Sequence, residues 1–149
     1  MDKKHLRLRS LAAFLVPVAF AVYMMYPAPV GRLAEADTAP AVALVVHLDG
    51  GGCAQADIRD GQALADLLTP RWSVRTSEAV DSQPGDILLL WGDYTVVLRS
   101  DRQYLKDNRE GGLTRQLPGK ALYDQVLSLL NTDTLPKELQ DALNQEVHS

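Results

Sequence analysis

A long uncharged stretch near the N-terminus, directly after a cluster of basic residues, is the feature that most constrains this chain. No charged residue lies between Arg9 and Arg32, and residues 11–26 are apolar apart from two tyrosines. The excess of positive charge before such a stretch predicts a cytoplasmic N-terminus. We therefore expect a single-pass protein of a bacterial inner membrane, with its C-terminal domain in the periplasm. The basic residues that precede the stretch are Lys3, Lys4, Arg7 and Arg9.

The length of the stretch is compatible with either a cleaved signal peptide or a retained membrane anchor. Residues 11–26 are longer than a typical signal-peptide core but shorter than the roughly 20 residues that span a bilayer comfortably. The nearest pair of small residues with cleavage spacing, Ala34 and Ala36, lies well beyond the apolar run. We favour a retained anchor over a cleaved signal, and we expect residues 10–30 to contact the membrane.

The rest of the chain divides into a spacer and one domain. Residues 27–41 are rich in proline and alanine and have no apolar period, which is typical of an extended linker. Residues 42–149 form a segment long enough to bury a core. The expected organisation is a cytoplasmic stub with an anchor or signal segment over 1–26, a linker over 27–41, and a periplasmic α/β domain over 42–149.

Composition excludes several classes of function. Residues 37–149 carry ten Lys or Arg against seventeen Asp or Glu. An acidic body without a basic cluster is not expected to bind nucleic acid. The glycines at 50–52 lack the third glycine of a dinucleotide motif and the Lys-Ser/Thr of a phosphate loop, so no nucleotide is expected. One cysteine and three histidines give no zinc pattern, and the aspartates lack calcium-loop spacing; we therefore expect no metal and no cofactor.

Apolar patterning predicts strands in the first part of the domain. Residues 41–48 are typical of a strand buried on both faces, which helices should cover. A second strand is expected over 72–76, and a hairpin over 87–98 that turns at Gly92. Between the first two strands, apolar spacing predicts a helix that begins at Asp60 or as early as Ala54 and ends before Pro70.

The second part of the domain alternates less clearly. Residues 101–118 are polar and are expected to form a long loop. Two amphipathic helices follow, over 122–130 and 135–143. The resulting order predicts an α/β layered domain with a central mixed sheet and C-terminal helices.

The position of Cys53 resembles the redox motif of the thioredoxin-like fold, which follows a strand and opens a helix. The corresponding stretch here is 46–56, Val-His-Leu-Asp-Gly-Gly-Gly-Cys-Ala-Gln-Ala, and residues 83–93 are similar to that family's proline, strand, turn and strand. The resemblance covers about residues 42–131. Ala56 stands where the resolving cysteine would be, so the resemblance implies a scaffold, or at most a thiol that forms mixed disulfides with a partner.

Cys53 is the candidate catalytic residue. At a helix N-terminus its thiolate would be favoured, although the charges of Asp49 and Asp57 would oppose this. His47 could act as the base, with Asp49 orienting it. The alternative interpretation is that Cys53 is an incidental small residue and that His47 is a hydrogen-bonded core group.

The 101–118 stretch supplies candidate partner-binding residues. Its basic side chains alternate with acidic ones, which is compatible either with a solvated loop or with a docking surface. The candidates are Arg102, Lys106, Arg109 and Arg115.

These features favour a membrane-anchored periplasmic accessory or assembly protein that is not an enzyme. We expect it to bind another envelope protein, in a secretion, conjugation or envelope-maintenance machine. The alternative is a tethered monothiol thioredoxin-like protein that acts on exported substrates through Cys53.

Overall fold

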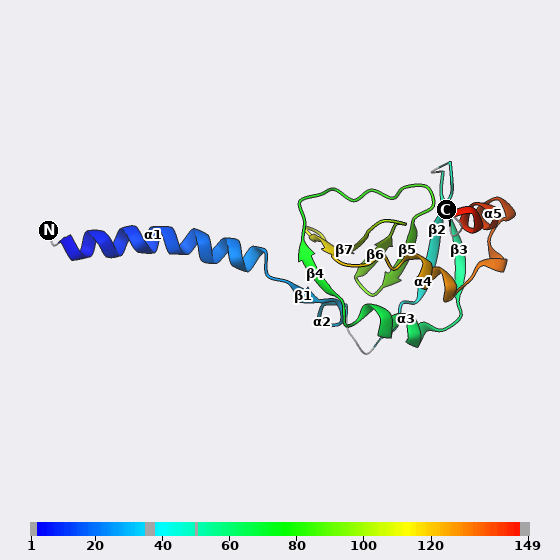
Figure 1. Cartoon of the computed structure of the whole chain (residues 1–149), viewed down its shortest axis with the longest axis horizontal. Coiled ribbons are helices and arrows are strands. Elements are labelled where there is room, and N and C mark those ends of the chain that lie inside the picture. The colour runs from blue at the N-terminus through cyan, green and yellow to red at the C-terminus, as the bar shows by residue number, and fades with distance from the viewer. Residues whose placement is uncertain (1–2, 35–37, 50, 147–149) are drawn as a thin grey trace.

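The computed structural model describes residues 3–34, 38–49 and 51–146, without the side chains of residues 3–12, 24, 145 and 146. Helix α1 (Lys3–Met24) extends away from a body formed by the rest of the chain (Figure 1). Within this described part, none of the helices has the length and apolar character needed to cross a membrane. The predicted N-terminal membrane helix is therefore wrong. The basic residues before the apolar stretch are part of α1, so the helix is uncharged only over residues 10–24.

The body is built on one antiparallel sheet of nine strands, in the order β1-β4-β8-β7-β6-β5-β2-β3-β9. Every neighbouring pair of strands is antiparallel. The strands are β1 (Ala28–Pro29), β2 (Val42–Val46), β3 (Cys53–Ile58), β4 (Trp72–Arg75), β5 (Ile87–Trp91), β6 (Tyr94–Leu98), β7 (Gln103–Asp107), β8 (Thr114–Leu117) and β9 (Leu130–Asn131). The helices of the body are α2 (Val30–Leu33), α3 (Gly61–Leu68), α4 (Tyr123–Ser128) and α5 (Lys137–Glu146), with a 3-10 turn at Thr132–Thr134.

This architecture corrects the predicted fold class, because the sheet is antiparallel throughout and a thioredoxin-like layered domain with a mixed sheet is wrong. The first difference lies at 53–58, where the longer helix would have begun. These residues form β3, which pairs with β2 as a hairpin. Helix α3 starts instead after Asp60, whose Oδ1 accepts a hydrogen bond from the Ala63 N–H at 2.9 Å.

The second difference lies at 101–118, where the predicted loop is a hairpin of β7 and β8. Its buried positions include polar residues, so the alternation that marks a strand is hidden in the sequence. Gln103 is 1% exposed; its Nε2 donates to the Leu117 carbonyl at 2.9 Å and its Oε1 accepts from the Leu122 N–H at 3.2 Å. The buried amide therefore has hydrogen-bond partners at both its nitrogen and its oxygen, as buried polar groups in folded proteins generally do.

The hairpin predicted over 87–98 is confirmed. Strands β5 and β6 pair from Ile87 with Leu98 to Trp91 with Tyr94. Gly92 takes a φ of +56° at the turn, a conformation that favours glycine.

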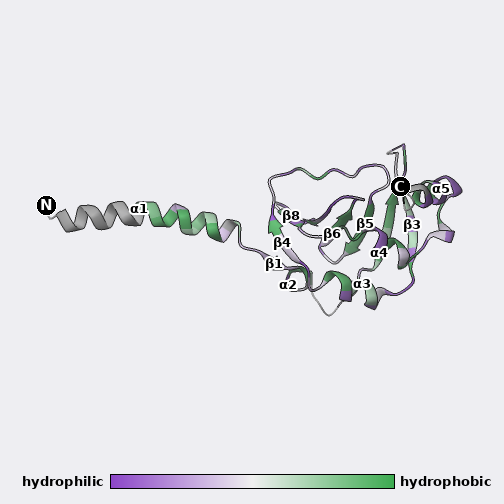
Figure 2. Cartoon of the chain, viewed as in Figure 1, coloured by the Kyte–Doolittle hydropathy of each residue, from purple (hydrophilic) through white to green (hydrophobic). Residues whose placement is uncertain are grey.

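Hydrophobic residues cover both faces of the central strands. The main core lies between one face of the sheet and helices α2, α3, α4 and α5, and Figure 2 shows its apolar strands. On the other face, Leu88, Val97 and Tyr104 pack with Val80. Val80 belongs to the segment 76–86, which arches from β4 to β5 (Figure 1).

The region predicted as a linker over 27–41 contains residues that pack on the body. Strand β1 pairs with β4, and Val30 is fully buried in the main core. The Val30 N–H donates to the Arg71 carbonyl at 2.8 Å. The end of α1 is therefore joined to the sheet by only a few residues.

Candidate functional site

A pocket of about 270 Å³ is lined by residues of α2, β4, β6, β7, β8 and the β7–β8 loop. Three arginine side chains line it, and we call it the arginine pocket. Strand register places its main residues on one face of the sheet, because Arg75 is paired with Arg115 and Tyr94 with Asp107. The residues used to define it are Arg75, Tyr94, Asp107, Arg109 and Arg115.

Arg115 forms the buried wall of the pocket and is 8% exposed. Its Nε donates to Ser73 Oγ at 2.8 Å, and its Nη2 donates to the carbonyl oxygens of Tyr26 at 3.0 Å and Ser73 at 3.1 Å. These acceptors are uncharged. They fix the plane of the guanidinium but do not neutralise it.

Arg75 lies directly opposite Arg115 on the neighbouring strand. Like charges in this relationship repel each other. Burial lowers the pKa of Arg115, and the charge of Arg75 lowers it further. Arg75 also lies over the ring of Tyr23, 5.9 Å from its centroid, and so connects the pocket to α1.

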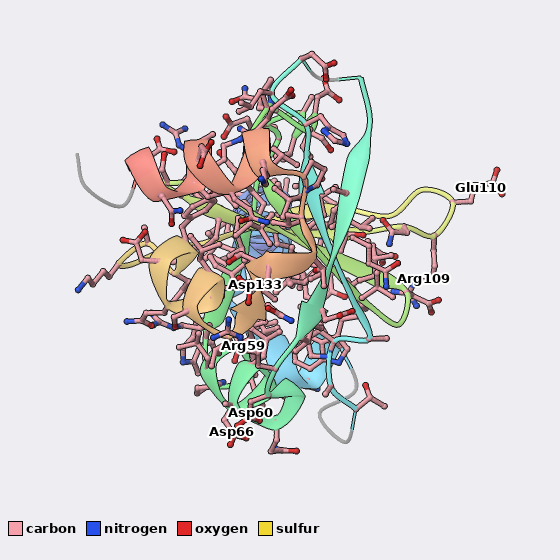
Figure 3. The ribbon with its side chains drawn as sticks, turned by 90° about the vertical axis from the view of Figure 1, so that its right-hand side faces the viewer. Arg59, Asp60, Asp66, Arg109, Glu110 and Asp133 are labelled. Atoms are coloured by element: carbon pink, nitrogen blue, oxygen red, sulfur yellow. The ribbon has the colours of Figure 1, made fainter. Side chains whose placement is uncertain are left out.

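Arg109 stands at the rim, on the loop between β7 and β8. Its Nη2 donates to Asp107 Oδ2 at 2.7 Å and to Tyr94 Oη at 2.8 Å, and its Nε donates to Asp107 Oδ1 at 2.9 Å. The bonds from Arg109 lower the pKa of Asp107 below its ordinary value. Gly112 allows this loop to close, because a Cβ there would overlap the Asp107 carbonyl. Figure 3 shows Arg109 and Glu110 together at the projecting loop.

A second pocket, of about 200 Å³, lies on the other side of the same rim. It shares Leu33, Tyr94 and Arg109 with the arginine pocket. Trp91 closes it, with its Nε1 donating to Thr38 Oγ1 at 2.9 Å.

The four predicted partner-binding residues divide into two groups. Arg109 and Arg115 come together in the arginine pocket. Lys106 is exposed on β7, and Arg102 precedes that strand, paired with Asp101 at 2.9 Å. Alternation along β7 turns Lys106 to the face opposite Asp107.

Sequence reasoning missed Arg75, Tyr94 and Asp107 as members of this site. Arg75 was expected only as a position of a half-exposed strand, and Tyr94 as a hairpin residue. One signal in the sequence was available. Ser73 and Arg75 are two residues apart on the expected strand, so their polar side chains lie on the same face of it.

The structure places Cys53 at the start of strand β3, where it is exposed. It does not open a helix, so the helix-based argument for a favoured thiolate has no basis here. Its cross-strand neighbour is Val46, and the His47 N–H donates to the Gly52 carbonyl at 2.9 Å. This register turns His47 and Cys53 to opposite faces of the hairpin. The catalytic pairing of the two stays a prediction that this register disfavours.

Among the residues that the structure describes, no group of three or more His, Cys, Asp or Glu side chains could hold a metal ion. The arginine pocket is instead suited to an anion, since its lining contains three guanidinium groups and one carboxylate.

Comparison with family models, with curated proteins and with solved structures finds no match for the chain. The fold and the site define an antiparallel α/β body that carries an arginine-lined pocket and a projecting N-terminal helix.

Proposed function

We propose that this chain is a membrane-associated accessory protein of a bacterial-type envelope, which binds another envelope protein and is not an enzyme. In this proposal α1 contacts lipid, and the body presents a binding surface. The proposed setting is a secretion, conjugation or envelope-maintenance machine.

The exposed apolar side chains of α1 carry the proposal. Nine of the twelve large hydrophobic residues exposed in the described part of the chain lie between Phe14 and Tyr26, including Phe20 at 61% and Met25 at 73% exposed. Figure 2 shows an apolar section in the helix that projects from the body. Removing apolar surface from water lowers the free energy by roughly 25 cal/mol for each Å². A patch of this extent therefore favours contact with lipid.

The periplasmic location of the body is proposed from the charge distribution alone, in which basic residues precede the apolar section and an acidic chain follows it. A reporter that is active only in the periplasm, fused to the C-terminal end of the chain, is expected to be active. Activity there of a reporter that works only in the cytosol would contradict this location.

The loop between β7 and β8 is the surface that we propose for the partner. Arg109 is held by Asp107 and Tyr94 before any partner binds, so little side-chain entropy is lost on association. Glu110 beside it is exposed and points outward (Figure 3). A rigid projection that carries both charges is suited to recognising a complementary protein surface.

Site-specific photocrosslinking in intact cells tests this surface. A photoreactive residue in place of Glu110 is expected to give one discrete adduct, which the additional substitution Arg109→Ala weakens. The matched control replaces Asp66, an exposed acidic residue on α3, and is expected to give no such adduct. The same adduct from both positions contradicts the proposal. An adduct whose yield is unchanged by Arg109→Ala contradicts it as well.

The exposure of Cys53 favours a second candidate, a tethered thiol protein that forms mixed disulfides with exported substrates. Trapping with Cys53 intact, and its loss in Cys53→Ser, tests this function. Full function of Cys53→Ser in cells excludes it.

A further inference from the structure

Trp72 is an exposed aromatic residue of the body, and it lies beside the segment that connects the body to α1. Three large hydrophobic side chains of the described body are exposed; Trp72, at 55%, is the most exposed of them and the only aromatic one, and the others are Leu48 and Leu113. Trp72 begins β4, where it is paired with Pro29 of β1. A tryptophan side chain is usually well buried, so this exposure calls for a partner outside the chain.

The exposed apolar surface of α1 continues to Trp72. No charged residue lies between Arg9 and Arg32. Within that stretch Tyr26 and Pro27 are exposed, and Pro29, across from Trp72, is half-buried. The pairing of β1 with β4 holds this segment against the sheet. Trp72 therefore has a fixed place near the end of the apolar section.

The side chains at this junction are of the type that lipid interfaces favour. Tyr23 is 68% exposed and Tyr26 is 63% exposed, and Trp72 adds a third exposed aromatic ring. Tryptophan and tyrosine are enriched where hydrocarbon meets water, because each has an apolar ring and one polar group that can stay hydrated. Figure 1 shows β1 and β4 at the end of the body from which α1 projects. If α1 enters lipid, this end of the body is the part that meets the lipid surface.

We propose that Trp72 anchors the body in the interfacial layer of the lipid that α1 contacts. This inference rests on the lipid contact of α1 proposed above. A second point of attachment on β4 limits rotation of the body about the short segment that connects it to α1. The body therefore has one preferred orientation on the lipid surface.

Tryptophan fluorescence of the full chain tests the location of Trp72. The chain has two tryptophans, and Trp91 is fully buried. The difference between the emission of the natural chain and that of Trp72→Phe gives the signal of Trp72 without any change to the core. Both chains are added to phosphatidylcholine vesicles whose acyl chains carry bromine either near the headgroup or near the chain end. Bromine quenches tryptophans that lie at a similar depth.

The emission of Trp72 is expected to shift to shorter wavelength on addition of vesicles, and to be quenched more strongly by the shallow bromine than by the deep one. The emission that remains in Trp72→Phe comes from Trp91 and is expected to stay unchanged. Stronger quenching by the deep bromine would place Trp72 in the hydrocarbon layer and overturn the interfacial anchor.

Vesicle affinity provides a second test with a matched control. Leu48 is 52% exposed and lies in the turn between β2 and β3, on a part of the body away from α1 (Figure 1). Trp72→Ala is expected to lower the affinity for phosphatidylcholine vesicles about tenfold, because less apolar surface then leaves water, whereas Leu48→Ala preserves the affinity. Equal losses in the two variants would show only general apolar attraction and overturn the proposal.

Flotation of the same vesicles separates this inference from the proposed function. If the natural chain floats with the vesicles while the emission of Trp72 is unchanged, the anchor is overturned and the lipid contact of α1 stands. If the natural chain does not float, both are overturned.

Discussion

The guanidinium of Arg115 donates a hydrogen bond of 3.0 Å to the backbone carbonyl of Tyr26, 89 residues earlier in the chain. This contact joins β8, which pairs with β4 near one edge of the sheet, to the segment that follows the projecting helix. Its hydrogen bonds explain why the charged Arg115 is buried in β8. The same side chain also donates to Ser73 on β4, and so it links that strand to the segment that follows α1.

Replacing Arg115 tests its role in stability. Arg115→Met keeps much of the side-chain volume but removes every donor, leaving the acceptors on Ser73 and Tyr26 without this partner. We expect the free energy of unfolding to fall by about 2–3 kcal/mol, as for loss of hydrogen bonds to a charged group. Urea denaturation of the full chain measures it, with Arg59→Met as the control. An unchanged midpoint would show that the buried charge costs as much as its bonds contribute.

The pair formed by Asp86 and Arg99 is expected to support the second face of the sheet. Asp86 is 2% exposed and accepts from Arg99 Nε at 3.1 Å and from the Gln83 N–H at 2.8 Å. Asp86→Ala leaves the Arg99 charge without this carboxylate, and we expect a loss of about 3 kcal/mol. The double substitution Asp86→Ala with Arg99→Met should recover part of this loss. Denaturation curves that show additive losses would rule out the coupling.

The titration of Asp107 reports the geometry of the rim. Because Arg109 lowers the pKa of Asp107 in the folded chain, the carboxylate stabilises the fold above its unfolded pKa, and this contribution is lost as the pH falls through the lower folded value. Carboxyl carbon NMR should therefore give a midpoint for Asp107 below 3.8, the ordinary value. Arg109→Gln is expected to raise the midpoint. An unchanged midpoint in that variant would show that the pair does not form in solution.

Cys53 and His47 give a direct test of the proposed dyad. Since Cys53 is exposed, a thiol reagent should modify it completely in the folded chain without denaturant. The register turns His47 to the other face, so His47→Ala should leave the labelling rate unchanged at each pH. Slower labelling of Cys53 in His47→Ala would support the dyad. Asp49→Ala is the control, because it shows how much the labelling rate changes when a nearby charge alone is removed.

The parts of the fold that were predictable are those in which apolar residues alone define the element. The strand at 42–46 and the hairpin at 87–98 have continuous apolar runs, and the strand at 72–75 alternates. Helix α3 has a capping aspartate and an apolar face. In the apolar runs and in α3 the local pattern and the tertiary environment agree, whereas in the strand at 72–75 the large Trp72 is 55% exposed and Ser73 is fully buried.

The rest depends on contacts between distant segments. The hairpin of β7 and β8 buries Gln103 and Arg115, whose hydrogen-bond partners lie far along the chain and whose polarity indicates a loop. The small residues of β3 carry no strong preference, so pairing with β2 decides their conformation. Of the site, Arg109 and Arg115 were identifiable as candidates, but their meeting with Arg75 follows from strand order, which local patterning does not specify.

The contact between α1 and lipid is tested most directly by a single fluorescent probe on the helix. In a Cys53→Ser background, Phe20→Cys provides a unique attachment site on the apolar section, and Lys106→Cys provides a matched site on the body. An environment-sensitive label is attached at each position, and the full chain is added to vesicles that contain a brominated lipid. The account predicts a blue shift and quenching for the label at position 20 and neither change at position 106. A label at position 20 that stays as solvent-exposed with vesicles as without them would contradict it.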